Sequence, residues 1–449
     1  FFFQIGKLDP DIVIGYNIFA FDYHYITRRA GIFIKEDFNA SRILNKRTEF
    51  RDFSFKETEI YFPGRLNIDM FNYVKTLNLP VSSLNFVSET LLNKQKVDLP
   101  YLDMFKLIEK GDEESLHRVA HYCIMDSQLT LDIFDISHQW IQLLEVSKTS
   151  RIRIDEVYKM GQSIKFTNLL YQYCYNSNIC IDDDKEGVDE YHGAVVLEPS
   201  PGVYNLCSML DFTSLYPSVI ITHNICYTTL LKSKDIKGMN KDDYHIIDIS
   251  KNIDDNDSGN NSNSNSNGNV KGNRKKNDNT NHKIYYYTKK HEGILPRMMK
   301  ILLSERIKFK NLMKTATGID KIIYDKRQWA LKIQANSIYG CLGSKELKFL
   351  RFLPGAECTT GMGRNYLFKA IELINETPFE VIYGDTDSCL IKCDAIEGDV
   401  ELFIKNSIKV AEFVTSNLPE GMHLKYENTF SRLIIISKKK YSGILVNTD

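Results

Sequence analysis

Residues 379–393, FEVIYGDTDSCLIKC, constrain the fold of this chain more strongly than any other segment. Apolar residues on both sides of Gly384-Asp385-Thr386-Asp387 predict two strands joined by a tight turn. Two carboxylates at the tip of such an apolar hairpin repel each other unless a cation lies between them. Mg²⁺ is the natural cation because it binds carboxylates together with the phosphates of a substrate. The segment therefore predicts a β-hairpin whose tip binds magnesium.

A further carboxylate, Asp211, ends a short apolar strand in residues 208–220, SMLDFTSLYPSVI. The chain then turns, and Pro217 is suited to the start of a helix. Alone, Asp211 is explained equally well as a helix cap. Together with Asp387 it indicates two metal ions about 3.5–4 Å apart, which would activate a primer 3′-hydroxyl and stabilise the leaving pyrophosphate.

Two predicted helices, residues 294–316 and 319–337, carry the cations that phosphoryl transfer requires. Arg306 and Lys310 are four residues apart and so share a face of the first helix. Lys332 lies on the second helix, and the short connection between the two suits an antiparallel pair. Three cations from adjacent helices suit a triphosphate, although a solvated basic face is the ordinary alternative.

The residues that follow Lys332 in KIQANSIYG disfavour that alternative. Asn336 adds a polar side chain, and the flat ring of Tyr339 offers a surface for a base pair. Gly340 permits close approach of a backbone. We therefore expect this helix pair to bind a nucleoside triphosphate.

The composition is that of an ordinary globular protein. The 449 residues are 43% hydrophobic and 26% charged, which predicts two to four domains, and no run of eighteen apolar residues indicates a membrane span. A net charge of −1 argues against wholesale coating by nucleic acid but allows a local basic groove. The nine cysteines lack zinc-ribbon spacing, and a reducing compartment is expected.

Other segments set the domain organisation. Residues 11–26 predict a buried strand, a turn and a helix start, and residues 113–145 have apolar positions at helical spacing. An α/β first domain fits this pattern, and residues 155–178 predict a connecting helix. Residues 251–283 contain twelve Asn and almost no apolar residue, which predicts a disordered insertion.

Three motifs together resemble a known family. DFTSLYPS, KIQANSIYG and YGDTDS are similar, in order and separation, to motifs A, B and C of family B DNA polymerases. HNICYTTLL at 223–231 resembles the stretch after motif A in delta-type and large-DNA-virus replicative enzymes. Each motif alone is moderately specific, whereas the ordered set is very specific. The resemblance implies a DNA-directed DNA polymerase that uses two Mg²⁺ ions at its polymerase site.

The resemblance also implies a role for each matching polymerase residue. Asp211 and Asp387 would hold the two metals, and Asp385 would support the site. Tyr216 would be the steric gate, with its ring where a ribose 2′-hydroxyl would lie. The other residues that would bind the incoming nucleotide are Leu215, Arg306, Lys310, Lys332, Asn336 and Tyr339.

Three further motifs imply contacts with DNA. KKKY at 438–441 resembles a motif that contacts the primer–template duplex, and TTGMGR resembles a template-strand contact. YHGA at 191–194 falls where the family has a DNA-contacting linker, although Ala194 replaces its second glycine. The implied DNA-binding residues are Tyr191, Gly193, Gly363, Arg364, Lys438, Lys439 and Tyr441.

Two motifs resemble those of the 3′–5′ exonuclease of the same family. GYNIFAFD contains Asn17 and Asp22, and YCIMD contains Tyr122 and Asp126. Asp22 and Asp126 would bind divalent metal, and Tyr122 would orient the attacking water. Taken singly, these residues are as readily a turn cap and a core tyrosine.

The family pattern is incomplete at both ends of the chain. The Asp-x-Glu pair expected upstream has no counterpart before Asp11. We therefore expect a chain truncated at its N-terminus, with an incomplete proofreading site. The thumb expected after motif C is also missing.

The implied fold is α+β and multidomain. It consists of an RNase H-like α/β exonuclease domain, then an antiparallel-sheet palm with a helical hairpin as fingers. The expected boundaries are 1–150 for the exonuclease, 151–292 for the linker helix and first palm part, 293–345 for the fingers and 346–449 for the second palm part.

The implied partners are primer–template DNA, deoxynucleoside triphosphates and a sliding clamp or accessory subunits, with no membrane. The expected location is the nucleus or a viral replication compartment, for a viral or eukaryotic source. Two alternatives remain open. A reverse transcriptase would carry adjacent aspartates rather than Asp-Thr-Asp, and a degenerate scaffold would not need Asp211, Asp387 or Lys332.

Overall fold

The computed structural model describes residues 1–33, 39–54, 57–95, 99–181, 193–249, 283–347, 350–396 and 398–446. Nearly all of the predicted disordered segment 251–283, and Tyr191, lie outside these residues. The chain divides into two compact units. Unit 1 comprises Phe1–Gly161 and Phe309–Ala330, and unit 2 comprises Gln162–Lys308 and Leu331–Asp449. In the described part of the chain, no helix has the length and apolar character needed to cross a membrane.

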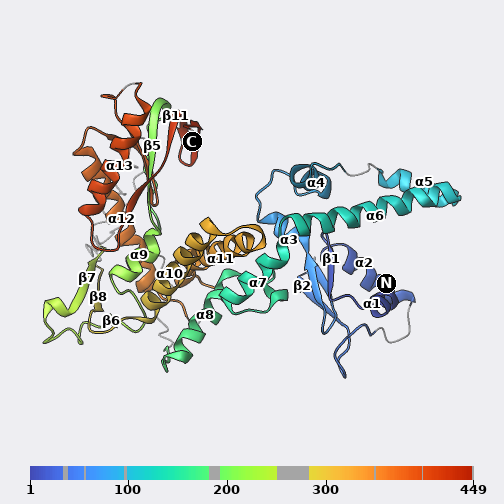
Figure 1. The fold of residues 1–449 in the computed structure, drawn as a ribbon. Helices are drawn as coiled ribbons and strands as arrows, with labels where there is room; N and C mark the ends of the chain where they lie inside the picture. The colour runs from blue at the N-terminus through green and yellow to red at the C-terminus, as the bar shows by residue number, and fades with distance from the viewer. Residues whose placement is uncertain are drawn as a thin grey trace, which may run out of the picture. The chain divides into compact units, whose positions relative to one another are not determined.

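Unit 1 combines small sheets with helices (Figure 1). Its parallel strands are β1 (Ile12–Gly15) and β4 (Leu66–Asp69), and its antiparallel strands are β2 (Glu49–Ser54) and β3 (Glu57–Tyr61). Its helices are α1 (Phe2–Leu8), α2 (Asp22–Phe33), α3 (Met70–Lys75), α4 (Leu84–Leu92), α5 (Tyr101–Lys110), α6 (Glu113–Ile136) and α7 (Gln139–Ser150). The strand, turn and helix predicted for residues 11–26 are confirmed by β1 and α2.

A tight turn joins β1 to α2. A Cβ on Gly15 would lie 2.1 Å from Cγ2 of Ile18, so the close approach here requires glycine. Asn17 takes up the left-handed conformation with φ of 61°, which asparagine tolerates better than most residues. Ile18 and Phe19 then enter a buried cluster with Tyr23. The apolar burial fixes where α2, and thus Asp22, begins.

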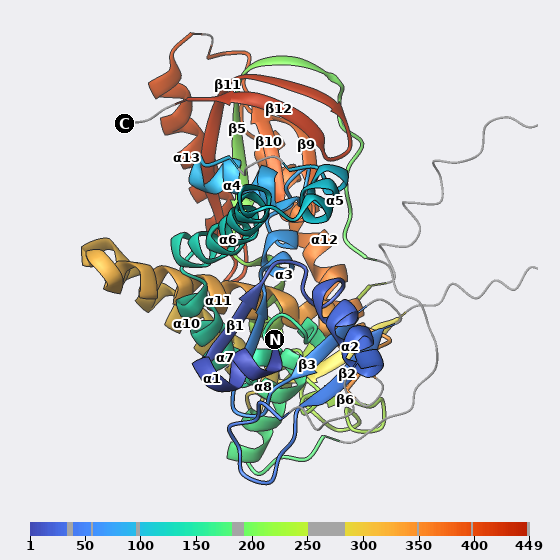
Figure 2. The same cartoon turned by 90° about the vertical axis from the view of Figure 1, so that its right-hand side faces the viewer.

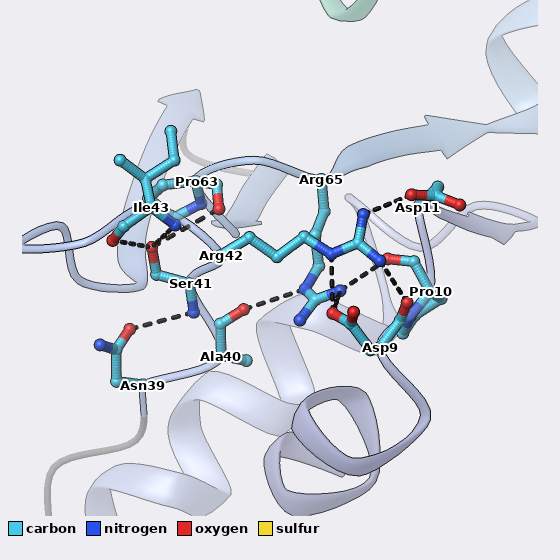
Figure 3. Close-up of polar contacts among 10 residues, drawn as sticks. All are labelled: Asp9, Pro10, Asp11, Asn39, Ala40, Ser41, Arg42, Ile43, Pro63 and Arg65. Carbon is cyan, nitrogen blue, oxygen red and sulfur yellow. Dashed lines mark hydrogen bonds and ion pairs between the residues drawn. The ribbon is translucent and has the colours of Figure 1, made fainter.

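Two arginines fasten the segment before β1 to the rest of unit 1 (Figure 3). The Nη1 of Arg65 lies 2.7 Å from Asp9 Oδ1, and its Nε donates to the carbonyl of Ala40 at 2.9 Å. Arg42 donates to Asp9 at 2.7 Å and also pairs with Asp11. Hydrogen bonding from Arg42 lowers the pKa of Asp9 to about 2. The Arg65 side chain is only 3% exposed, so these acceptors are what makes its burial tolerable.

Two helical predictions are confirmed with different bounds. Residues 113–145 lie in α6 and α7, which are separated by His138, with φ of 51°. Leu116 and Ile124, two apolar residues of α6, are 46% and 65% exposed, whereas Ile133 is fully buried. The predicted connecting helix starts later, as α8 (Gln162–Asn176), and leaves Ile164 exposed. Apolar spacing predicted helix here but could not tell a core face from an exposed one.

Unit 2 is built on a five-stranded sheet in the order β12-β11-β5-β10-β9 (Figures 1 and 2). Its strands are β5 (Gly202–Phe212), β9 (Glu380–Asp385), β10 (Ser388–Lys392), β11 (Leu424–Ser437) and β12 (Lys440–Leu445), and every neighbouring pair is antiparallel. Helix α12 (Leu353–Asn375) packs against β9, and α13 (Val400–Ser416) packs against β11 and β5. The predicted strands around Gly384-Asp385-Thr386-Asp387 are confirmed by β9 and β10.

Unit 2 contains a second sheet, whose strands lie between β5 and β9 in the sequence. It contains β6 (Leu230–Leu231), β8 (Ile284–Thr288) and β7 (Tyr244–Asp248), in that order. The carboxylate of Glu357 on α12 accepts from Lys283 at 2.9 Å and from Tyr285 at 2.6 Å. Glu357 is buried, so this pair of bonds ties β8 to α12.

The two predicted cation-bearing helices are confirmed as α10 (Ile294–Thr315) and α11 (Gly318–Leu342), although α11 continues past the expected end at residue 337. Gly318, with φ of 58°, makes the short connection. The rings of Phe309 and Tyr324 lie 5.8 Å apart and join the two helices near this connection. Arg327 of α11 also pairs with Glu145 of α7 at 2.9 Å, both within unit 1.

His223, which ends helix α9 (Leu215–Thr222), lies in an unusual environment. Its Nε2 is 2.6 Å from the hydroxyl of Tyr366, and its ring lies 5.5 Å from that of His245. Burial, with a smaller effect of His245, lowers the pKa of His223 to about 4 from an ordinary value of 6.5. The folded state therefore binds fewer protons than the unfolded state between these two values.

This difference predicts a specific acid sensitivity. As pH falls from about 6.5 to 4, His223 should lower the free energy of unfolding by up to about 3 kcal/mol, and the loss should level off below pH 4. His223→Gln should reduce this loss, which unfolding by urea at several pH values would measure. His117→Gln, at an exposed position of α6, is the control and should leave the pH dependence unchanged. Identical pH profiles for wild type and His223→Gln would contradict the prediction.

Candidate active site

The register of the five-stranded sheet brings the predicted carboxylates together. Ser388 on β10 pairs with Asp211 of β5 on one side and with Asp385 of β9 on the other. The backbone N–H of Phe212 donates to the carbonyl of Asp387 at 2.8 Å. Asp211, Asp385 and Asp387 therefore lie at one edge of adjacent strands, although 174 residues of sequence separate Asp211 from Asp385.

Backbone hydrogen bonds from residues outside the hairpin hold the turn between β9 and β10. Thr386 adopts φ of 58°, and its N–H donates to the carbonyl of Val195 at 3.0 Å. The N–H of Leu197 donates to the carbonyl of Gly384 at 2.9 Å. These bonds satisfy backbone groups at the hairpin tip and restrict its movement.

Mutual repulsion and burial perturb the two central carboxylates. Burial, followed by the charges of Asp387 and Glu427, raises the pKa of Asp211 to about 7, while Lys332 opposes the rise. Burial also raises the pKa of Asp387, with Asp385 and Glu427 adding to the effect. The site thus concentrates negative charge in a partly desolvated place, which a cation would stabilise.

Glu427 was missed by the sequence analysis. It lies on β11 where the pairing with β5 shifts register, between Tyr426 and Asn428. Its charge raises the pKa of both Asp211 and Asp387. The residue belongs to KYENTF, and its place beside the aspartates depends on this irregularity in the strand, which the residue pattern does not reveal.

The donor set suits a cation that takes part of its coordination from a substrate. Among the described residues, no group of three or more His, Cys, Asp or Glu side chains is arranged to hold a metal ion by itself. Mg²⁺ is commonly bound by one or two carboxylates plus substrate phosphates. Asp211 and Asp387 fit that requirement, because burial and neighbouring carboxylates raise the pKa of both groups more than the nearby lysines lower it.

Asp385 has a different set of neighbours. Its carboxylate accepts from the hydroxyls of Thr386 at 2.9 Å and Tyr383 at 3.3 Å, and lies 3.3 Å from Lys439 Nζ. The N–H of Lys439 donates to the Tyr383 hydroxyl at 2.9 Å, and the ring of Tyr441 meets that of Tyr383 edge-on. The turn of KKKY is thus anchored to the carboxylate hairpin. Lys438, by contrast, pairs with Glu198 at 2.5 Å.

Two tyrosines and a glycine form the wall beside these carboxylates. Tyr216, near the start of α9, has its ring centroid 4.3 Å from that of Tyr339 on α11. A Cβ on Gly363 of α12 would lie 2.9 Å from Cε1 of Tyr216. Leu215 is buried beneath them. The absence of a side chain at 363 therefore sets how far the Tyr216 ring can lie toward α12.

The predicted cations differ in their surroundings. Lys332, Asn336 and Gly340 lie at four-residue intervals on α11 and are exposed on one stripe. Burial lowers the pKa of Arg306, and its Nε is buried without a hydrogen-bond partner among the described residues. Such a buried donor is costly unless an acceptor is supplied, which an anionic ligand would do. Lys310 is exposed and belongs to unit 1, whereas Arg306 and Lys332 belong to unit 2.

The residues expected to contact a template strand are not on the surface. Gly363 and Arg364 are both buried in α12. Arg364 Nη1 donates to the carbonyl of Gly193 at 2.5 Å, and burial lowers the pKa of Arg364. Both residues pack within unit 2, and the template-strand contact expected of them stays a prediction. Gly193 itself is exposed, and Tyr191 lies outside the described residues.

The exonuclease-like residues lie in unit 1. Asp22 opens α2, and burial, with the charge of Asp69, raises its pKa. Tyr122 and Asp126 lie one turn apart on α6 and are half-buried.

Asp69 is a further residue that the sequence analysis missed. Its buried carboxylate accepts from the N–H groups of Asn17 at 2.7 Å, Phe19 at 3.2 Å and Phe71 at 3.0 Å. It thereby caps α3 and holds the turn that leads to Asp22. An aspartate between a strand and a helix in LNIDMF was the available signal, since it indicates an N-cap.

Comparisons with known proteins identify the family. Residues 152–449 match the family "DNA polymerase family B", and residues 1–87 match "DNA polymerase family B, exonuclease domain". The DNA polymerase delta catalytic subunit of Candida albicans is 30% identical over 98% of this chain and 41% of its own length. That of Plasmodium falciparum is 32% identical over 98% of this chain and 40% of its own length.

A solved structure shows the same fold. The family B DNA polymerase of the hyperthermophilic archaeon Pyrobaculum calidifontis superposes with a TM-score of 0.67 at 23% identity, over 98% of this chain and 52% of that one. The chain spans about two-fifths of the length of the curated relatives that it matches. Because the first family model covers well over half of the residues, and both units have a matching model, the chain belongs to DNA polymerase family B.

Proposed function

We propose that this chain carries the polymerase and exonuclease sites of a DNA-directed DNA polymerase that adds deoxynucleotides to a primer 3′-hydroxyl. The observation that carries the proposal is the half-buried pair Asp211 and Asp387, with Lys332 beside it. The pair would hold two Mg²⁺ ions, which would activate the attacking hydroxyl and stabilise the leaving pyrophosphate. Asp385 is assigned a supporting role, because Tyr383, Thr386 and Lys439 already engage its carboxylate.

The protein groups proposed to bind the incoming nucleotide act on its separate parts. Arg306 and Lys332 would bind the phosphates, and the unsatisfied Nε of Arg306 supports this because an anion would complete its hydrogen bonding. Lys310 and Asn336 are assigned to the same phosphates by the family pattern. Tyr339 would lie against the base, and Tyr216 would exclude a ribose 2′-hydroxyl. The backbone of Leu215 would line the triphosphate pocket.

The proposed subdomains follow the family pattern. Residues 1–150 would be the exonuclease domain, residues 151–292 and 346–449 the palm, and residues 293–345 the fingers. Lys438, Lys439 and Tyr441 would contact the primer–template duplex, supported by the anchoring of their turn to Tyr383. Accessory subunits or a sliding clamp, and a nuclear or viral replication compartment, are proposed from the delta-type relatives alone.

Removing one metal-binding carboxylate tests the polymerase proposal. Asp387→Asn keeps the size of the side chain but removes the charge, so nucleotide addition by the intact polymerase should fall about 10³-fold or more. Single-turnover extension of a labelled primer would measure this, and DNA binding should persist. The control is Asp394→Asn, which removes the same charge from an exposed residue that pairs with Lys392. Extension at a normal rate by Asp387→Asn would contradict the two-metal assignment.

The packing of Tyr216 predicts a change in sugar discrimination. Tyr216→Ala should increase ribonucleotide incorporation relative to deoxynucleotide by about 10–200-fold, since discrimination would rest on one steric contact. Gly363→Ala should also alter the ratio, because its Cβ would displace the Tyr216 ring. Gly361→Ala is the matched control, since its Cβ would instead meet Ile249. An unchanged ratio in Tyr216→Ala would remove the gate role, as measured by kcat/KM for both sugars.

The exonuclease proposal can be tested through the residue that positions Asp22. Asp69→Ala removes the acceptor of three N–H groups, so primer degradation by the intact enzyme should fall about tenfold or more while extension continues. Asp69→Asn, which retains one carbonyl oxygen, should restore part of the rate. Asp399→Ala, which removes the N-cap of α13 in unit 2, serves as the control. Primer degradation at the wild-type rate in Asp69→Ala would contradict the positioning role.

A further inference from the structure

Unit 2 contains a cavity that the proposed polymerase site does not use. Its volume is about 340 Å³, within the range of about 300 to 1,000 Å³ that small-molecule sites occupy. It lies where the C-terminal end of α9, strand β7 and the start of α10 meet, with Asn224 and His245 among its lining. Tyr216 lies at the opposite end of α9, about 10 Å away for a helix of this length.

The lining is dominated by cations. Lys289, Lys290 and Lys300 line the cavity, against one acidic residue, Glu292. Lys300 pairs with Glu292 at 2.7 Å, and Lys290 pairs with Asp243 at 3.2 Å. Among the described residues, no ion pair involves Lys289. The positive charge of the lining therefore exceeds its negative charge, and an anion entering the cavity would be attracted.

Asn224 holds the loop that carries Lys289 and Lys290 in place. The side-chain amide of Asn224 donates to the carbonyls of Thr288 at 2.7 Å and His291 at 2.8 Å, and its Oδ1 accepts from the N–H of Gly293 at 2.8 Å. Asn224 is 9% exposed, so these three bonds are shielded from water. The N–H of Lys289 also donates to the carbonyl of Asp243 at 2.8 Å. The positions of the lysine backbones are thus fixed before any ligand binds.

Two further features favour a negative ligand. The 22-residue helix α10 begins beside this cavity, so the positive end of its dipole adds to the attraction for anions, although the N–H groups of Gly293 and Leu295 are already bonded. Burial, with the charge of Lys289, lowers the pKa of His245, which lines the same cavity. The imidazole therefore responds to the positive charge of the site, and a bound anion should alter its environment.

We propose that this cavity is an accessory phosphate-binding site, separate from the triphosphate site at the other end of α9. The phosphate can come from the backbone of a single-stranded DNA or from free inorganic phosphate, and both present the same anionic oxygens to the lysines. The site does not depend on the polymerase assignment, because none of its residues belongs to the proposed catalytic or nucleotide-binding set.

The imidazole of His245 provides a local readout. With histidine labelled by ¹⁵N, its resonance can be assigned by its loss in His245→Gln and followed during titration with inorganic phosphate or with a twelve-residue oligothymidylate. A saturable shift is expected with at least one of the two ligands. Lys289→Gln/Lys290→Gln should weaken the binding about tenfold or more. Lys405→Gln/Lys409→Gln on α13 removes the same charge from exposed positions and should leave the titration unchanged.

The two ligands distinguish the sources of the phosphate. Binding of oligothymidylate that weakens as salt rises assigns the site to a nucleic-acid strand. In Lys289→Gln/Lys290→Gln, the slope of log K against log salt concentration should then decrease in magnitude by about one to two. A shift with inorganic phosphate alone assigns the site to free phosphate. Two results would overturn the proposal: no saturable shift of His245 with either ligand, or equal weakening by both lysine pairs, which would indicate a general effect of charge.

Discussion

The repulsion between Asp211 and Asp387 is the constraint on which the structure of unit 2 depends. Two carboxylates in a partly desolvated position cost free energy, and the pKa of Asp211 near 7 expresses that cost. The fold brings them together through strand register, because Ser388, the chain neighbour of Asp387, pairs with Asp211. Backbone bonds to Val195 and Phe212 then prevent the hairpin from moving aside. A site in which the fold keeps like charges close together is characteristic of a functional site rather than of core packing.

The charged residues around Asp211 and Asp387 offset this repulsion only in part. Positive charge reaches the pair from Lys332 on α11, whereas Lys439 meets Asp385. Negative charge is added by Glu427, so the lysines do not neutralise the site. The negative charge that remains would be offset by a divalent cation. Arg306 has the opposite need, because its buried Nε lacks an acceptor among the described residues.

Much of this arrangement could be predicted from local pattern. Asp211, Asp385 and Asp387 each lie at the end of an apolar strand beside a turn, and both helices α10 and α11 follow from their periodicity. The burial of Gly363 and Arg364 in α12 was not foreseen, because a motif names residues without saying which of them face outward. Asp69 and Glu427 escaped for a different reason. The sequence marks Asp69 only as an N-cap, and its bonds to the turn before Asp22 are tertiary, whereas Glu427 depends on a register shift that spacing does not encode.

The irregularity at Glu427 has a consequence for how this protein tolerates insertions and deletions. Side chains alternate between the two faces of a strand, so the extra residue in β11 reverses the alternation for everything that follows it along the strand. Removing one residue there would leave the hydrophobicity of β11 almost unchanged, yet it would exchange the inward and outward sides of the strand as far as Ser437. Lys439, which meets Asp385 from the next turn, would then be presented from the wrong side. A single-codon deletion in this strand would thus spare the core composition and still disrupt the ion pair between Lys439 and Asp385.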